Sequence, residues 1–181
     1  YAVRDLFRSE NAFLQKRLGE VWLHSAEVAS ASYALAQSLG HFDPDHAMLL
    51  GLLHDIGMLP IISYLEQFPE LLESPRDIED TITQLHGEIG AAILQKWNFG
   101  DDFVEVAIAA DDWHRETNSE ADYCDLVMIA QLHVFIGKQA AEIQKIVGDG
   151  EIPNFADLPA FKKLGLSWDD PKQSISILAN A

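Results

Sequence analysis

The chain has 181 residues, 48% of them hydrophobic, and a formal net charge of −17 at pH 7. This length and hydrophobic content suit one soluble domain with a buried core, and no stretch approaches the roughly 20 uninterrupted apolar residues that span a bilayer. Because the acidic side chains dominate and the basic ones are scattered, we expect no nucleic-acid partner and no anionic membrane surface.

The N-terminal residues and the single cysteine also limit the class of protein. Residues 1–13 mix charges and lack an apolar core segment, so we expect no signal peptide. The start at Tyr1 rather than Met suggests a fragment or processed chain, and we expect an N-terminal portion of a longer protein to be missing. Cys124 is the one cysteine, which excludes an internal disulfide and fits a reducing cytoplasm. No basic neighbour in sequence activates it, so an inert buried thiol is expected.

Every element that the sequence predicts is a helix, since no alternating strand pattern and no internal repeat occurs. The first helix runs from Gly19 to Gly40, which has the place of a C′ glycine. The second begins with Asp43 as its N-cap and Pro44 at its first position, and it stops near Gly57.

The rest of the chain continues this helical pattern. Further helices are predicted over residues 58–68, 74–85, 86–98, 101–114 and 121–146, the last with a break near Gly137, and two short pieces flank a Leu-Gly-Leu turn within residues 155–181. The expected fold is therefore all-α, a compact array of roughly eight to ten helices without a sheet, and a single domain over residues 1–181.

Four histidines lie on the apolar faces of their predicted helices: His24, His54, His86 and His114. A buried imidazole needs a hydrogen-bond partner, and a backbone carbonyl is enough, so each one alone indicates a core histidine. Four that converge on one core are less easily accidental. Asp55, beside His54, adds a carboxylate to a set that Zn, Fe, Mn or Ni sites favour.

Three motifs carry a family resemblance. They are VWLHS with His24, LLHDIG with His54 and Asp55, and LHGEIGAAILQKWNFGDDFVEVAIAADDWH, which starts one residue before His86. The first two resemble the HD superfamily of metal-dependent phosphohydrolases, all-helical enzymes with a lone His, a His-Asp pair and a later Asp. The third, with the C-terminal LPAFKKLGLSWDD, is similar to the HDOD branch (HD-related output domain) of bacterial signalling proteins. The likeness extends over residues 20–170.

The chain departs from the family pattern at several places. By resemblance, the last metal ligand of the superfamily is an Asp, and Gln131 occupies its place, on an apolar helix face. The later His pair of the HDOD pattern is reduced to Trp113-His114. The GYP signature of cyclic-di-GMP phosphodiesterases does not follow, which disfavours that activity. The implied metal ligands are His24, His54 and Asp55, with Gln131 at the fourth position.

The first functional hypothesis is a non-catalytic module of the HDOD type for signal output or protein interaction. It would act in the bacterial cytoplasm and keep a degenerate metal site as a polar core. The family resemblance implies a signalling protein as partner, which the sequence does not identify, and the oligomeric state is left open. The loss of a carboxylate at Gln131 and the charge of −17 both favour this interpretation.

The second hypothesis is a metal-dependent phosphohydrolase acting on a small phosphorylated or nucleotide substrate. A divalent ion (Fe, Mn, Zn, Ni or Mg) held by the three implied ligands would activate a water nucleophile, with His86 and His114 around a second ion. Asp111 or Asp112 would supply the charge that Gln131 does not. A third hypothesis, a sensor with a small ligand in a helical cleft, rests only on the inward polar groups.

Overall fold

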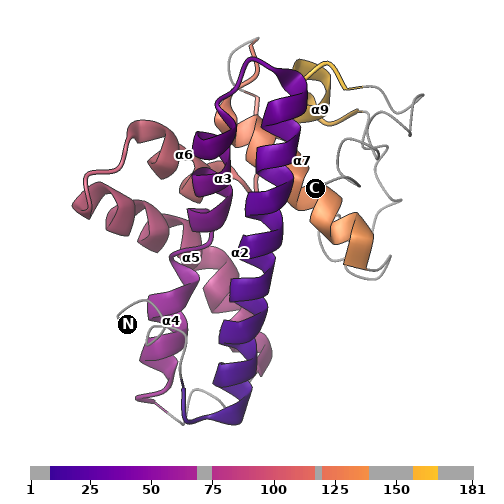
Figure 1. Ribbon diagram of the computed structural model, residues 1–181. Coiled ribbons are helices and arrows are strands. Elements are labelled where there is room, and N and C mark those ends of the chain that lie inside the picture. Colours follow the sequence, from indigo (N-terminus) through magenta and orange to yellow (C-terminus); the bar gives the residue numbers. More distant parts are fainter. Residues whose placement is uncertain (1–8, 69–74, 117–119, 139–156, 167–181) are drawn as a thin grey trace. The chain divides into compact units, whose positions relative to one another are not determined.

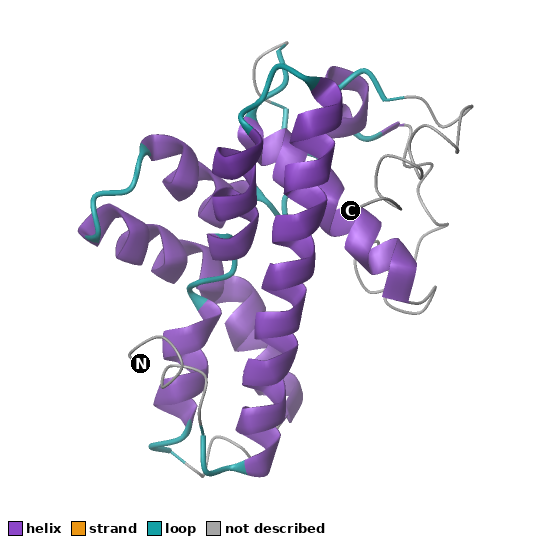
Figure 2. Cartoon of the chain, in the orientation of Figure 1, coloured by secondary structure: helices purple, strands orange, loops and turns teal. Residues whose placement is uncertain are grey.

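Helices make up the regular structure of the chain wherever it is described. The computed structural model describes residues 9–68, 75–116, 120–138 and 157–166. These residues form α2 (Ala12–Leu39), α3 (Pro44–Leu53), α4 (Met58–Leu65), α5 (Pro75–Lys96), α6 (Asp101–Ala109), α7 (Tyr123–Lys138) and α9 (Pro159–Lys163), shown in Figure 1. Figure 2 shows no strand among them. The all-α prediction is confirmed for these residues, although they form fewer helices than the roughly eight to ten expected.

Helix α2 begins earlier than the sequence predicts and ends where it predicts. The side-chain Oδ1 of Asn11 accepts hydrogen bonds of 2.9 and 3.3 Å from the backbone N–H groups of Phe13 and Leu14. Because this cap satisfies donors of the first turn, the helix starts well before Gly19. At the other end Gly40 has a φ of +74°, a left-handed conformation that glycine adopts without strain.

Helix α3 starts at the predicted cap but is shorter than predicted. Asp43 Oδ1 accepts hydrogen bonds of 2.9 and 3.3 Å from two backbone N–H groups of the first turn. Pro44 is the first helical residue, where its missing N–H costs nothing. The predicted end near Gly57 is wrong, because α3 stops at Leu53 and residues 54–57 form a turn before α4.

Helix α5 takes the place of two predicted helices. The sequence predicts separate helices over residues 74–85 and 86–98, whereas one helix spans the joint between them. No proline interrupts that joint. Gly87 is a weak helix former, but it lets α5 approach α6 closely, since a Cβ there would lie 2.9 Å from the carbonyl oxygen of Ala107. Close helix packing therefore outweighs the local preference.

The helices after α5 follow the prediction in part. Helix α6 stops at Ala109 instead of continuing to His114. Helix α7 lies within the predicted range 121–146 and passes through Gly137 to Lys138, so the expected break does not occur at Gly137; residues 139–146 lie outside the described part of the chain. Helix α9 is the first of the two short pieces expected near the C-terminus, and Gly165, with a φ of +65°, makes the turn after it. The second piece lies outside the described residues.

Contacts divide the chain into two compact units. The first unit comprises Tyr1–Ala26 and Leu53–Ile108, and the second comprises Glu27–Leu52 and Ala109–Ala181. Helix α2 contributes its first part to one unit and its second part to the other. The single-domain organisation over residues 1–181 stays a prediction.

Each unit has its own apolar core. In the first unit α4 packs against α5, and the start of α2 joins them. The buried residues of this core are Leu14, Leu18, Val21, Leu59, Ile61, Ile62, Leu65, Ile78 and Ile82. In the second unit α9 packs against α7. Four apolar residues of α7 are completely buried: Leu126, Val127, Met128 and Ala130.

One stretch, Pro44–Leu65, is long and apolar enough to cross a membrane by length and composition. Its mean hydropathy is 1.6, and half of the residues that give this value are buried inside the protein. Core helices of soluble proteins pass the same test, and this stretch is α3 and α4 with a turn between them that holds buried His54 and Asp55. The evidence for a membrane span is therefore weak.

Candidate metal centre

The turn between α3 and α4 places His54 and Asp55 in the interior of the first unit. His54 is 3% exposed and Asp55 is 5% exposed. Backbone hydrogen bonds of 3.0 Å from Ile56 N–H to the Leu53 carbonyl and 2.9 Å from Met58 N–H to the Asp55 carbonyl fix the turn. Both side chains thus leave a well-defined backbone, which is a condition for a preorganised site.

Two further histidines of the same unit surround the Asp55 carboxylate. Asp55 Oδ2 lies 3.3 Å from His54 Nε2 and 3.8 Å from Nε2 of His24, which comes from α2. Asp55 Oδ1 lies 3.8 Å from Nε2 of His86, which comes from α5. One carboxylate therefore sits among three imidazole nitrogens. We call these four residues, His24, His54, Asp55 and His86, the His/Asp cluster.

The cluster keeps its carboxylate ionised. Burial raises the pKa of Asp55. The charge and hydrogen bond of His54 and the charges of His24 and His86 lower it by more than burial raises it, so the pKa is about 2 instead of 3.8. Asp55 is thus an anion throughout the physiological pH range. It is available as a ligand to any cation that enters the cluster.

The ring of His86 is held in one orientation. Its Nδ1 lies 2.9 Å from the carbonyl oxygen of Ile82, one turn earlier on α5. Because a carbonyl only accepts, Nδ1 must donate, and in the neutral ring Nε2 then turns a lone pair toward Asp55. Two acceptors that face each other at 3.8 Å repel unless a proton or a cation lies between them. Metal-ligating histidines typically donate their other ring N–H to a carbonyl in this way.

Gly57 brings the turn into contact with α5. A Cβ at this position would collide with the carbonyl oxygen of His86 and the backbone nitrogen of Gly90. Its φ of −67° and ψ of −19° are ordinary right-handed values, so the predicted role as a helix terminator is wrong. Glycine is needed here because the turn carrying Asp55 lies directly against the backbone that carries His86.

The donor atoms of the cluster fit a divalent transition metal. The ligand atoms of His24, His54 and Asp55 lie within 4.8 Å of one another. A single ion with ligand distances of about 2.0–2.2 Å can bridge this separation after small side-chain movements. Of the ions that the sequence suggests, Zn, Fe, Mn and Ni suit imidazole ligands, whereas Mg prefers oxygen.

The other predicted site residues lie in the second unit. The prediction that His114 points inward at the end of a helix is wrong, because His114 is exposed and lies in a turn after α6. In this turn the backbone N–H of His114 donates a 3.3 Å hydrogen bond to Oδ1 of Asp112, a local bond that competes with helix continuation. Asp111 and Asp112 are exposed as well. Gln131 points inward as predicted, is 1% exposed, and donates from Nε2 to the Ala110 carbonyl at 3.1 Å.

Sequence reasoning missed the place of His86. It pairs His86 with His114 around a second ion, whereas His86 lies beside Asp55 in the first unit. Two sequence signals could have found this arrangement. Ile82 precedes His86 by one helical turn, which suits a ring-to-carbonyl hydrogen bond, and Gly90 follows it by one turn, on the side where another backbone can approach closely.

The sequence of the chain also matches the model of a protein family. The model of the HDOD domain matches residues 1–113 of the chain. This range includes the whole His/Asp cluster and ends directly before His114. The expected resemblance at Gln131 and in the C-terminal segment lies beyond the match and stays a prediction.

Two solved structures share the fold. A candidate metal-dependent phosphohydrolase from Shewanella amazonensis matches 98% of this chain with a TM-score of 0.69 and 24% identity. An HDOD domain protein of unknown function from Geobacter sulfurreducens matches 97% with a TM-score of 0.64 and 20% identity. The chain spans 64% and 62% of the lengths of these two proteins. At such identities the likeness establishes the fold alone.

A search of curated protein sequences finds no match to the chain. The assignment therefore rests on the family model, which covers residues 1–113 of 181. The all-helical fold and the buried His-Asp pair are consistent with it. The chain belongs to the HDOD domain family.

Proposed function

We propose that the chain is an output or interaction module of a bacterial signalling protein, with a metal-binding core that does not hydrolyse phosphate esters. It would act in the cytoplasm through a protein partner. The observation that carries this proposal is the state of Gln131. At the position where the resemblance implies an acidic ligand, this chain has a buried neutral amide whose nitrogen donates to the Ala110 carbonyl.

The hydrogen bond of Gln131 gives that position a structural role. The amide nitrogen donates to the carbonyl of Ala110, at the end of α6. A carboxylate at the same place would set two acceptors against each other in a buried environment, which costs free energy. The position of Gln131 therefore favours a hydrogen-bond donor. With a neutral amide in place of an acid, the expected metal site has one negative charge fewer.

The charge of the whole chain supports the same proposal. At a net charge of −17 the chain repels phosphorylated small molecules at long range, which disfavours the binding of an anionic substrate. A protein partner with a basic surface meets no such barrier.

The retained metal centre is tested by metal binding. Stripped protein titrated with Zn²⁺, Mn²⁺, Fe²⁺ or Ni²⁺ should take up about one ion, and His54→Ala or His86→Ala should weaken the affinity by at least about tenfold. His41→Ala is the control, since His41 is an exposed histidine outside the cluster whose Nδ1 lies 3.0 Å from the Leu39 carbonyl. Calorimetry and elemental analysis give the readout. Equal affinities for all four proteins would contradict a metal site in the cluster.

The absence of hydrolysis is tested separately. Protein loaded with each metal should release no product from phosphomonoesters, phosphodiesters or nucleotides. Turnover that disappears in His54→Ala would overturn the non-catalytic proposal. Because this assay follows metal loading, a negative result comes from a protein whose metal content is known.

Metal-dependent phosphohydrolysis is the second candidate. It is favoured by the three imidazoles around one carboxylate and by the orientation of His86. One of the two fold relatives is itself a candidate metal-dependent phosphohydrolase. Under this alternative the wild-type protein turns over substrate. The hydrolysis assay therefore distinguishes the two candidates. A gain of metal affinity in Gln131→Asp would support the first one, because it indicates a site short of one carboxylate.

A further inference from the structure

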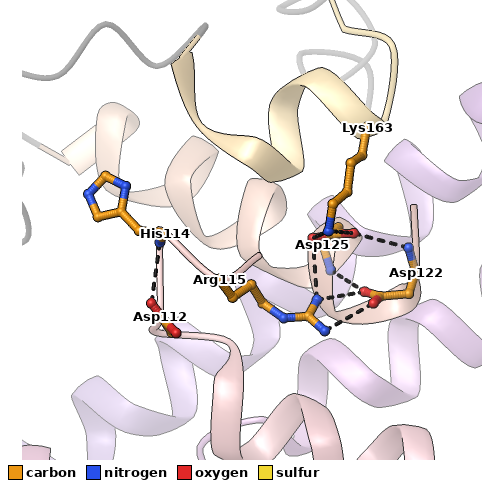
Figure 3. A network of polar contacts seen from close by, with 6 residues as sticks. All are labelled: Asp112, His114, Arg115, Asp122, Asp125 and Lys163. Carbon is orange, nitrogen blue, oxygen red and sulfur yellow. Dashed lines mark hydrogen bonds and ion pairs between the residues drawn. The ribbon is translucent and has the colours of Figure 1, made fainter. Parts of the chain in front are cut away.

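Four charged residues form a cluster in the second unit, shown in Figure 3: Arg115, Asp122, Asp125 and Lys163. They come from three parts of the chain, namely the segment after α6, the start of α7, and α9. The side chains of Arg115 and Asp125 are 4% and 0% exposed, and that of Lys163 is 11% exposed. We call this group the ion cluster.

Arg115 binds both acids at the start of α7. Its two terminal nitrogens donate to the two carboxylate oxygens of Asp122 at 2.8 and 3.0 Å, and one also donates to Asp125 Oδ1 at 3.3 Å. The acids cap the helix reciprocally, since Asp125 N–H donates to Asp122 Oδ1 at 2.9 Å and Asp122 N–H donates to Asp125 Oδ2 at 3.2 Å. Arg115 is therefore attached to the end of α7 by a fork of charged hydrogen bonds.

Lys163 completes the cluster from α9. Its Nζ lies 3.4 Å from Oδ1 and 3.3 Å from Oδ2 of Asp125. Two cations then balance two carboxylates. Without Lys163, one negative charge would remain uncompensated beside a fully buried Asp125, a situation that proteins tolerate poorly.

The segment of residues 110–116, which we call the loop, depends on this cluster. Its first residue, Ala110, is held by the Gln131 amide, and near its other end Arg115 is held by the acids. Between these points lie the exposed side chains of Asp111, Asp112 and His114. Arg115 is thus the charged anchor of a segment whose exposed residues are acid, acid and imidazole.

We infer that α9 controls the loop through Asp125, so that displacement of α9 releases the segment carrying Asp111, Asp112 and His114. Lys163 and Arg115 share Oδ1 of Asp125, which is completely buried. Displacement of α9, which packs against α7, removes Lys163 and lets water reach this carboxylate, and hydration weakens the charged hydrogen bonds that hold Arg115. This control goes beyond the proposed function. Helix α9 is then a positioning element: its displacement changes the exposed surface formed by Asp111, Asp112 and His114.

Two neighbouring lysines allow a matched test. Lys163→Met removes the buried partner of Asp125, whereas Lys162→Met removes the same charge from a side chain that is 61% exposed and paired with exposed Asp157. Hydrogen exchange of the full chain is read at the Arg115 amide, which donates to the Asp112 carbonyl at 2.9 Å. Lys163→Met should accelerate this exchange by at least about tenfold more than it accelerates the amides of α2, and Lys162→Met should change it by less than about twofold.

Equal effects of the two substitutions, or acceleration that is the same in the loop and in α2, would overturn the inference. The unmodified protein provides a second test that does not depend on the folding of a variant. In low guanidinium, the amides of Arg115 and of Leu166, which follows α9, should exchange with the same dependence on denaturant. Exchange of Arg115 at a distinctly lower denaturant dependence than Leu166 would show that the loop opens without α9, and the inference would fail.

Discussion

Gly57 shows how a single residue without a side chain can set the geometry of the candidate metal centre. Its backbone angles are open to any residue, so conformational freedom does not explain the glycine. The reason is the contact of the turn with the α5 backbone at His86 and Gly90. This contact holds the Asp55 carboxylate at 3.8 Å from the His86 ring.

Substitution of Gly57 should therefore damage both the fold and the metal centre. We expect Gly57→Ala to lower the free energy of unfolding by about 1–3 kcal/mol, because the new Cβ forces the turn away from α5. The same movement separates Asp55 from His86 and should weaken metal affinity. Urea denaturation and metal titration measure the two effects.

Gly19 provides the matched control for this substitution. It lies within α2, and a Cβ there would meet nothing within 4 Å. Gly19→Ala should raise the free energy of unfolding by roughly 0.5–1 kcal/mol through helix propensity alone and leave metal affinity unchanged. If Gly57→Ala behaved like Gly19→Ala, the contact with α5 would not be what holds the turn.

The candidate site could be predicted in part at the scale of residues. The family resemblance implies that His24, His54 and Asp55 meet in one site, and their ligand atoms do lie within 4.8 Å of one another. The place of His86 could not be predicted, because it depends on how closely two backbones approach at Gly57. Such a distance is a property of packing and leaves only an indirect trace in the sequence.

At the scale of helices, local signals predicted some ends and tertiary contacts decided others. The cap at Asp43 and the glycine at Gly40 are chemical signals that act within one turn, and both were predicted correctly. The continuity of α5 through Gly87 and the end of α6 at Ala109 were not. The first depends on packing against another helix, and the second on the turn that Asp112 stabilises.

The start of α7 should respond to acid through Asp122. Burial raises the pKa of this carboxyl, but the hydrogen bonds from Arg115 and the Asp125 backbone, with the charges of Arg115 and Lys163, lower it more, so that the net pKa lies below the ordinary value of 3.8. A lowered folded-state pKa stabilises the fold above the ordinary value, and this contribution is lost as the pH falls through the folded-state pKa.

Asp122→Asn tests this dependence with the helix cap retained, since Asn caps helices about as well as Asp. The variant should have a lower melting temperature than the wild type at pH 6, and the difference should shrink as the pH falls below about 4. Asp43→Asn makes the same exchange at the cap of α3, where Asp43 forms no ion pair within the described part of the chain, and should cost less at pH 6. A difference for Asp122→Asn that stayed constant with pH would contradict the role of its charge.

For the whole molecule, the dominant electrostatic feature is self-repulsion. The chain has twenty-nine acidic residues and twelve basic ones, so there are too few lysines and arginines to pair with most of the carboxylates. The ion cluster and the His/Asp cluster each place positive groups around a buried acid, but the other acids in the described part of the chain lie mostly at exposed positions. Their mutual repulsion destabilises the compact state. Composition alone predicts this property, whereas the two buried clusters required the structure.

Salt should therefore stabilise the protein. Raising sodium chloride from 10 to 150 mM shortens the screening length from about 30 to about 8 Å and weakens repulsion between surface carboxylates. We expect the melting temperature to rise by a few degrees, measured by circular dichroism on metal-free protein, and KCl to act like NaCl. A fall with added salt would mean that attractive ion pairs outweigh the repulsion.

Cys124 gives the second unit a natural reporter. It is the one thiol of the chain, it is 2% exposed, and it lies in α7 beside Asp125. A thiol-specific reagent can react with it only when the first turn of α7 opens. The rate of labelling in the unaltered protein therefore measures how often that helix end opens, and any partner, metal or modification that tightens or loosens it can be detected without an engineered probe.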